Sequence, residues 1–171
     1  MTLAAKPRER AASRPISKQR LRLWLRLLRA ARAIEAELRE KLRKEFAITL
    51  PQFDVMAALA RQDGGKDAGK ETGMNMTELS RMLMVSNGNV TGIIDRLAAE
   101  KLVQRQAPAS DRRSFIVRLT PKGAAQFAII AKAHEGWVDD LLAGFDAAEA
   151  EVLIEQLGDL ASGVRKGGVE L

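Results

Sequence analysis

The chain has 171 residues, 46% of them hydrophobic, which is enough for one ordinary domain with a core. It carries 28 Lys and Arg against 22 Asp and Glu, and this excess of positive charge favours polyanionic partners, nucleic acid first among them. The lack of cysteine excludes disulfides and thiol-based redox sensing, and the single histidine, His134, argues against a zinc site. No stretch has the roughly 20 apolar residues of a membrane span, and the basic N-terminal stretch has no apolar signal-peptide core, so we expect a cytoplasmic protein without a membrane partner.

The first 48 residues are predicted to form an arm and a long helix. Residues 1–15 mix charge, Ala, Ser and Pro without periodicity, which predicts a disordered basic arm. From Ser17 to about Glu45 there is no Gly or Pro, and apolar residues recur on one side of a 3.6-residue period. The apolar side consists of Trp24, Leu27, Leu28, Ala31, Ile34 and Leu38.

A second helix is predicted to start at Thr49-Leu50-Pro51-Gln52, where a Thr cap is followed three residues later by Gln. After this helix, the stretch Asp63–Asn75 holds four Gly among charged residues and is predicted to be a flexible loop.

The centre of the chain has the pattern of a winged helix-turn-helix. A short helix over Met76–Leu83 and a turn lead into a second helix over Asn87–Glu100, whose apolar residues Val90, Ile94 and Leu97 share one face. The opposite face is left for a partner. Two β-prone segments, Leu102–Gln106 and Phe115–Leu119, flank a loop and predict a two-stranded wing.

Two more helices follow the wing. Thr120-Pro121 is typical of a helix start, and this helix is expected to run to about Leu142. Asp146 and Glu149 form a second capping box, after which apolar residues recur at helical spacing up to Val164.

This mainly α order of elements, with the wing segment Asp111-Arg112-Arg113 followed by Val117, Leu119, Thr120 and Gly123, resembles the multiple-antibiotic-resistance regulator (MarR) family over roughly residues 17–166. The resemblance implies a homodimer whose terminal helices interlock and whose winged-helix lobes each read half of a pseudo-palindromic operator, with small ligands bound between the dimer helices and the lobes. It divides the chain into a disordered arm at residues 1–15 and an N-terminal dimerisation helix at 16–48. A DNA-binding lobe follows at 49–119, and C-terminal dimerisation helices follow at 120–171.

Two features depart from the family pattern. The loop Asp63–Asn75 is longer than usual, so we expect no pairing of a short strand at Met74–Met76 with the wing. The missing cysteine excludes the peroxide-sensing branch.

The helix Asn87–Glu100 is the candidate reading helix. Each of its glycines, Gly88 and Gly92, weakens a helix by roughly 1 kcal/mol relative to Ala, a cost that close approach to DNA would offset. Short hydrogen-bonding side chains at the same end could contact bases or phosphates. These are Ser86, Asn87, Asn89 and Thr91. The alternative is a frayed helix start with ordinary turn residues.

Basic residues around the wing are further candidates for DNA contact. Arg113 is predicted to enter a minor groove, braced by Asp111, while Arg112 meets phosphate. Arg96 and Arg105 could also meet phosphates. The alternative for each is a solvated surface charge.

Half of the basic residues lie between Lys6 and Lys44, away from the reading helix. Four of them form a stripe along one side of the first helix: Lys18, Arg22, Arg26 and Arg29. Three interpretations are open, namely a solvated helix face, a contact for the DNA backbone, and a site for a phosphorylated effector.

The run SNGNV from Ser86 to Val90 resembles p-coumaroyl-CoA-responsive repressors of aromatic-acid degradation. An aromatic acyl-CoA would place its acyl group among apolar residues that could equally be plain core. These residues are Trp24, Leu28, Phe53 and Met56. His134 and Trp137 could likewise line a ligand site or belong to the core.

The sequence therefore predicts a transcriptional regulator, a repressor released from double-stranded DNA by a small aromatic effector, with no cofactor. A winged helix that binds an acidic protein instead of DNA is the alternative. Catalysis is rejected because the chain has no cysteine, no phosphate-cradling Gly motif, no metal-ligand spacing and no paired carboxylates on a recognisable scaffold.

Overall fold

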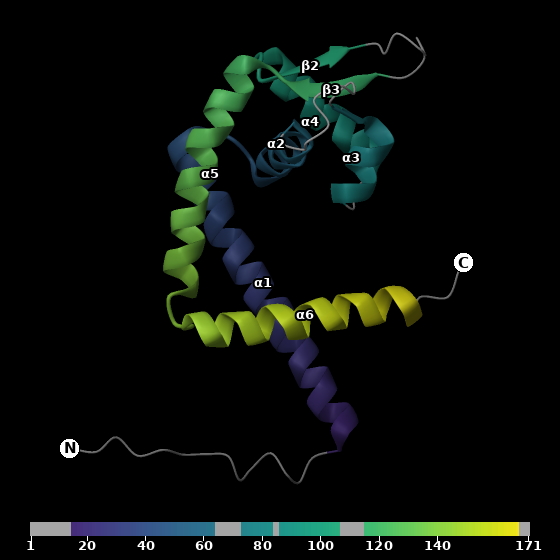
Figure 1. The fold of residues 1–171 in the computed structure, drawn as a ribbon, viewed down its shortest axis with the longest axis vertical. Coiled ribbons are helices and arrows are strands. Elements are labelled where there is room, and N and C mark those ends of the chain that lie inside the picture. Colours follow the sequence, from purple (N-terminus) through teal and green to yellow (C-terminus); the bar gives the residue numbers. More distant parts are fainter. Residues whose placement is uncertain (1–14, 64–72, 84–85, 107–114, 168–171) are drawn as a thin grey trace, which may run out of the picture.

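The computed structural model describes residues 15–63, 73–83, 86–106 and 115–167, without the side chains of Asp63, Asn87 and residues 165–167. In these ranges the chain is mainly helical, as predicted (Figure 1). Its elements are α1 (Ile16–Phe46), α2 (Leu50–Asp63), β1 (Met74–Asn75), α3 (Met76–Leu83), α4 (Asn87–Ala99), β2 (Val103–Gln106), β3 (Ile116–Leu119), α5 (Pro121–Leu142) and α6 (Ala147–Gly167). The predictions for the arm at 1–14, the loop at 64–72 and the wing tip at 107–114 lie outside the described residues.

Three helices begin at the caps that the sequence predicted. The Thr49 amide donates to Gln52 Oε1 at 2.8 Å, and the Asp146 and Glu149 pair exchanges amide-to-carboxylate bonds of 3.1 and 2.9 Å. The Gly123 amide donates to Thr120 Oγ1 at 2.9 Å. These bonds satisfy amides that a helix start leaves without an intrahelical partner, which fixes where α2, α5 and α6 begin.

The winged-helix lobe is built on one apolar core. Val90, Ile94 and Leu97 of α4 are fully buried, as their spacing predicted, and pack with side chains from α2, α3 and the sheet. Figure 1 shows α2, α3, α4 and the strands gathered at one end of the molecule. The core therefore fixes which face of α4 stays free.

The sheet corrects one prediction. Its order is β1-β3-β2, with antiparallel pairs that align Met74 with Val117 and Val103 with Leu119. The expectation that residues 74–76 would not pair with the wing is wrong. Met74 is buried in the lobe core, and that burial holds β1 beside β3 whatever the length of the loop before it.

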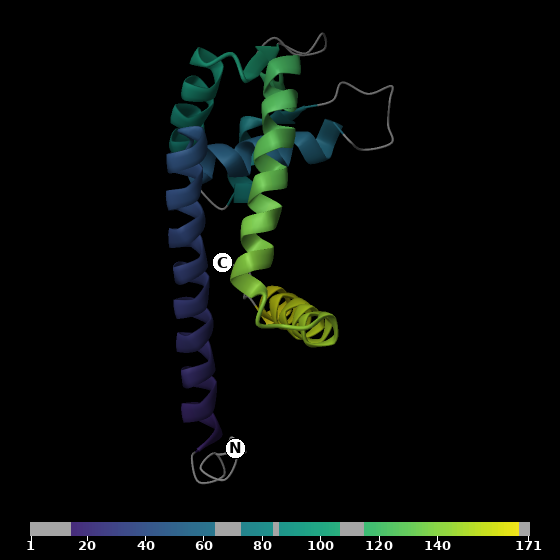
Figure 2. The ribbon, with the colours of Figure 1, turned by 90° about the vertical axis from the view of Figure 1, so that its left-hand side faces the viewer.

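A second cluster joins α1, α2 and α5 below the lobe, where α1 and α5 run alongside each other (Figure 2). Phe53 stacks on His134 with ring centroids 4.4 Å apart, and Phe46 packs against Trp137 at 6.0 Å. Burial lowers the pKa of His134, because the apolar surroundings disfavour its charged form. His134 and Trp137 are thus part of the packing that ties α1 to α5.

α6 stands away from the lobe. Figure 1 shows it crossing α1, and it forms no extensive contact with another described element. Its apolar side chains are exposed, including Leu157 at 47% and Leu160 at 50%. Across the described ranges, no helix combines the length and apolarity that crossing a membrane requires.

Candidate nucleic-acid interface

α4 presents a polar surface on the side opposite the lobe core. Ser86 caps the helix by accepting a hydrogen bond from the Asn89 amide at 3.4 Å. Ser86, Asn89, Thr91 and Arg96 are all exposed, whereas Val90, Ile93 and Ile94 are buried or half-buried. α4 begins at Asn87, whose side chain lies outside the described atoms.

Two glycines keep this surface open. A Cβ built on Gly88 or Gly92 would meet no atom within 4 Å, so packing within the chain does not require glycine at either position. Each glycine costs helix stability of roughly 1 kcal/mol relative to Ala. Together they leave backbone accessible along one side of α4.

Arg96 and Arg105 have different surroundings. Arg105 of β2 forms an ion pair with Asp95 of α4 at 2.5 Å, which ties the wing to the reading helix. Arg96 is exposed, one helical turn past Gly92. Of these two arginines, Arg96 is the better candidate for contact with a phosphate.

A groove of about 600 Å³ runs between α4 and the end of α1. From α4 it is lined by Gly88, Asn89, Gly92, Ile93 and Arg96, and from α1 and α2 by Arg39, Arg43, Thr49 and Pro51. The sequence did not single out the two arginines of α1, because nothing in the spacing along the chain places α1 beside α4.

Both α1 arginines have carboxylate neighbours on the same helix. Arg43 donates to the two oxygens of Glu40 at 2.8 and 3.0 Å, and Arg39 lies 4.0 Å from Glu35. The hydrogen bond to Glu40 raises the pKa of Arg43. All four side chains are more than half exposed, so these pairs are weak and open to exchange with another anion.

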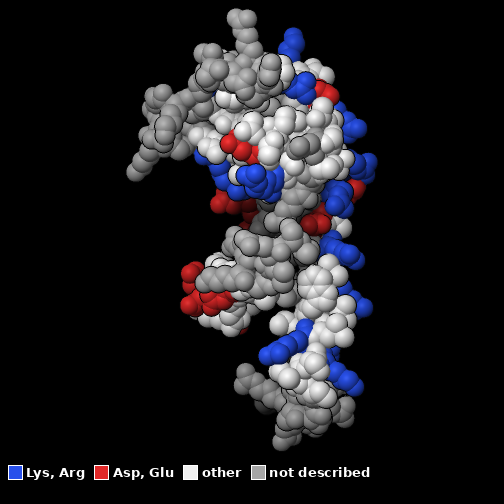
Figure 3. Space-filling model, turned by 90° about the vertical axis from the view of Figure 1, so that its right-hand side faces the viewer, with Lys and Arg blue, Asp and Glu red and all other residues white. Residues whose placement is uncertain are grey.

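Positive charge extends well beyond the groove. Figure 3 shows Lys and Arg side chains following one edge of the molecule, along α1 and up over the lobe, interrupted by a few acidic side chains. The predicted stripe lies on α1, and all its members are exposed. They are Lys18, Arg22, Arg26 and Arg29.

The predicted apolar lining of an effector pocket does not come together. Met56 is buried in the lobe core and Phe53 in the second cluster. Trp24 is 57% exposed, and Leu28 is half-buried. Trp24 lies about 21 Å along α1 from Leu38, the nearest buried residue of that helix, at 1.5 Å per residue. The predicted wing contacts Asp111, Arg112 and Arg113 lie outside the described residues.

Comparison with known proteins agrees with this geometry. The MarR family matches residues 48–114, which include α2, α3, α4 and β2. The repressor YetL of Bacillus subtilis is 26% identical over 91 residues, 53% of this chain and 54% of YetL. The transcriptional activatory protein BadR of Rhodopseudomonas palustris is 32% identical over 119 residues, 65% of this chain and 59% of BadR. The winged-helix lobe of this chain is therefore similar to MarR-family proteins. The chain spans little more than half the length of these two relatives.

Solved structures extend the likeness of fold to most of this chain. BldR from Sulfolobus solfataricus has a TM-score of 0.74 at 23% identity, covering 87% of this chain and 99% of BldR. A mutant MarR from E. coli, solved with operator DNA, has a TM-score of 0.69 at 23% identity, covering 86% of this chain and 99% of that chain. The two relatives are named as transcription regulators, which agrees with the prediction that the chain is not an enzyme.

Proposed function

We propose that this protein is a homodimeric transcriptional regulator that binds double-stranded operator DNA through α4 and the wing. The observation that supports this most strongly is the division of α4 into two faces. One face is locked into the lobe core through Val90, Ile94 and Leu97, and the other exposes Asn89 and Arg96. A helix fixed in this way can enter a major groove and keep its register there.

Side-chain changes on α4 and the wing test the DNA contacts. Asn89→Ala should weaken binding to a duplex selected by the wild-type protein by about 1–3 kcal/mol and relax the preference at one base position. Arg113→Ala should weaken binding by a similar amount, about 1–3 kcal/mol. Both are measured by fluorescence anisotropy on a panel of single-base variants of the duplex.

The panel of single-base variants distinguishes a contact to a base from a contact to phosphate. If Asn89→Ala weakened every duplex equally, its contact would be to phosphate. If neither variant changed affinity while the wild type bound an acidic protein in a salt-insensitive way, the protein-interaction alternative would replace the proposal.

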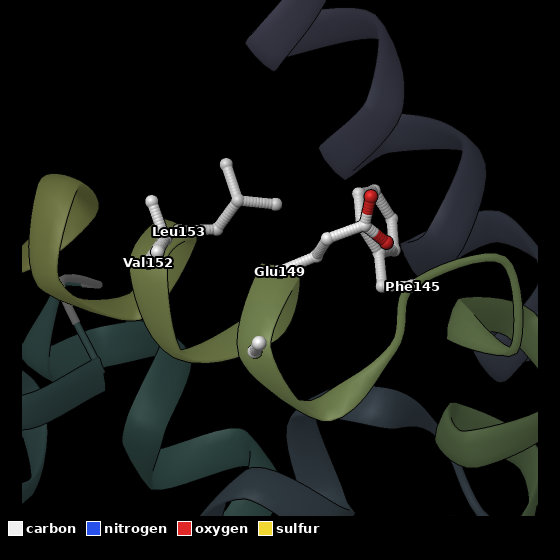
Figure 4. Close-up of a pocket in the computed structure, with 5 residues that line it drawn as sticks. Phe145, Glu149, Val152 and Leu153 are labelled. Atoms are coloured by element: carbon white, nitrogen blue, oxygen red, sulfur yellow. The ribbon is translucent and has the colours of Figure 1, made fainter.

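The apolar side of α6 supports the homodimer. Figure 4 shows Phe145, Glu149, Val152 and Leu153 projecting to one side at the start of α6, where they line a hollow of about 430 Å³. Most helical stability in proteins comes from packing of an apolar face, and an exposed apolar stripe calls for a covering surface. A second copy of the chain provides that surface through a two-fold interface in which α6 and α1 of both copies interlock.

We extend the proposal to repression relieved by an aromatic acyl-CoA such as p-coumaroyl-CoA, whose phosphates bind Lys18, Arg22, Arg26 and Arg29. This rests on the exposure of all four cations and on the exposed Trp24 of the same helix, which offers an aromatic surface. A ligand that prefers a lobe spacing unsuited to the operator weakens DNA binding by its differential affinity, typically about 1–3 kcal/mol.

Titration of the DNA complex with p-coumaroyl-CoA and with free p-coumarate tests this effector. The thioester should release DNA and the free acid should not, because only the thioester carries phosphates. The Arg22→Gln/Arg26→Gln variant should lose the response to the thioester while keeping its affinity for DNA. A response to the free acid alone would mean that the four cations of α1 form only a solvated helix face.

A further inference from the structure

The geometry points to a DNA-backbone site in the groove between α1, α2 and α4, where Arg39 and Arg43 of α1 bind phosphate beside the reading helix. This inference rests on the proposed function and extends it. It makes the C-terminal half of α1 part of the DNA interface, in addition to its role as a dimerisation helix.

The first support is the position of the charges. Arg39 and Arg43 are one helical turn apart on α1 and line the same groove as Arg96 of α4. Three guanidinium groups on two helices therefore border one open space. Guanidinium is the side-chain group best suited to phosphate oxygens, because it donates in a planar fork.

The shape of the groove is the second support. Its α4 wall is made largely by Gly88, Asn89 and Gly92, and neither glycine has another atom within 4 Å of where a Cβ would lie. A strand of DNA can therefore approach the α4 backbone on the side that faces the α1 arginines. Thr49, which caps α2, and Pro51 in its first turn complete the groove and bring the positive end of the α2 dipole to it.

The acidic neighbours give the site a distinctive property. In the free protein Glu40 and Glu35 partly neutralise Arg43 and Arg39. Phosphate must compete with these two carboxylates, so each glutamate weakens DNA binding. Removing Glu40 should therefore tighten the complex, an effect opposite in sign to removal of an arginine.

Salt-dependent binding to duplex DNA tests the site. The probes are a random-sequence 30-bp duplex and a duplex selected by the wild-type protein. Arg39→Gln and Arg43→Gln should each weaken binding to both duplexes about 3–10-fold and reduce the slope of log affinity against log salt by up to about 0.9. Glu40→Gln should tighten binding about 2–3-fold by the same reasoning.

Lys44→Gln is the matched control, because Lys44 is an exposed cation at the same end of α1 that does not line the groove. It removes the same net charge and should change affinity less than about two-fold. Circular dichroism and the melting temperature of each variant show that the fold is kept. A uniform charge effect, in which Lys44→Gln equals Arg43→Gln, would overturn the site.

Other outcomes separate this inference from the proposed function. If Arg39→Gln and Arg43→Gln bound DNA as the wild type does while Asn89→Ala weakened binding, the groove would lie outside the interface and the regulator would stand. If the wild type bound neither duplex, the proposed function would fail as well. If inorganic phosphate or benzoate raised the melting temperature through Arg96 and the arginine variants left DNA binding intact, the groove would be a small-anion site and the inference would be wrong.

Discussion

Gly123→Ala is expected to lower the free energy of unfolding by about 3 kcal/mol, because a Cβ at this position would overlap backbone. The added carbon would strike the Leu102 carbonyl oxygen and lie 2.8 Å from its carbonyl carbon. The same carbonyl accepts the Thr120 amide at 3.0 Å, so it cannot move without breaking the junction between β2 and α5. Urea denaturation at one fixed protein concentration measures the loss.

Gly92→Ala is the matched control, since nothing lies within 4 Å of where its Cβ would stand and α4 gains a better helix former. It should stabilise the protein by up to about 1 kcal/mol. Equal effects from the two substitutions would mean that α5 does not pack tightly against Leu102.

Leu157→Lys/Leu160→Lys is expected to convert the proposed dimer into a monomer of 18.7 kDa. Both leucines are about half exposed in the single chain and lie on the apolar side of α6. Burying each leucine across an interface contributes roughly 1.5–3 kcal/mol, and a two-fold interface counts every substitution twice. Light scattering at micromolar concentration reports the mass.

Glu155→Lys places the same side chain on the opposite side of α6 and should leave the dimer intact. The monomeric variant should also bind a full operator far more weakly, because each lobe then holds only one half-site. A double variant that kept the mass of two chains would place the dimer interface elsewhere.

The elements that could be predicted from the sequence are those with local causes. Thr49 and Gln52 cap α2 through bonds that span three residues, and Val90, Ile94 and Leu97 are buried because they share one helical face. Gly123 is one of the residues that carry the resemblance to the MarR family. The structure explains why glycine stands there, because Gly123 lets α5 start directly against Leu102.

The features that could not be predicted depend on contacts between distant parts of the chain. β1 has only two residues, too few to show an alternating pattern, so its pairing with β3 follows from the burial of Met74 alone. Phe53 and Met56 are three residues apart on α2 but enter different cores, which periodicity cannot separate. The groove formed by Arg39, Arg43 and α4 joins residues about 50 positions apart.

Selection from a random duplex pool, followed by the mass of the selected complex, tests the central claim most directly. We expect the wild-type protein to enrich an inverted repeat with half-sites about one helical turn (~34–36 Å) apart, bound by two chains per duplex, with affinity that falls steeply as salt rises. A pool without enriched sequence, bound independently of salt or by a single chain, would contradict the account of a dimeric DNA-binding regulator.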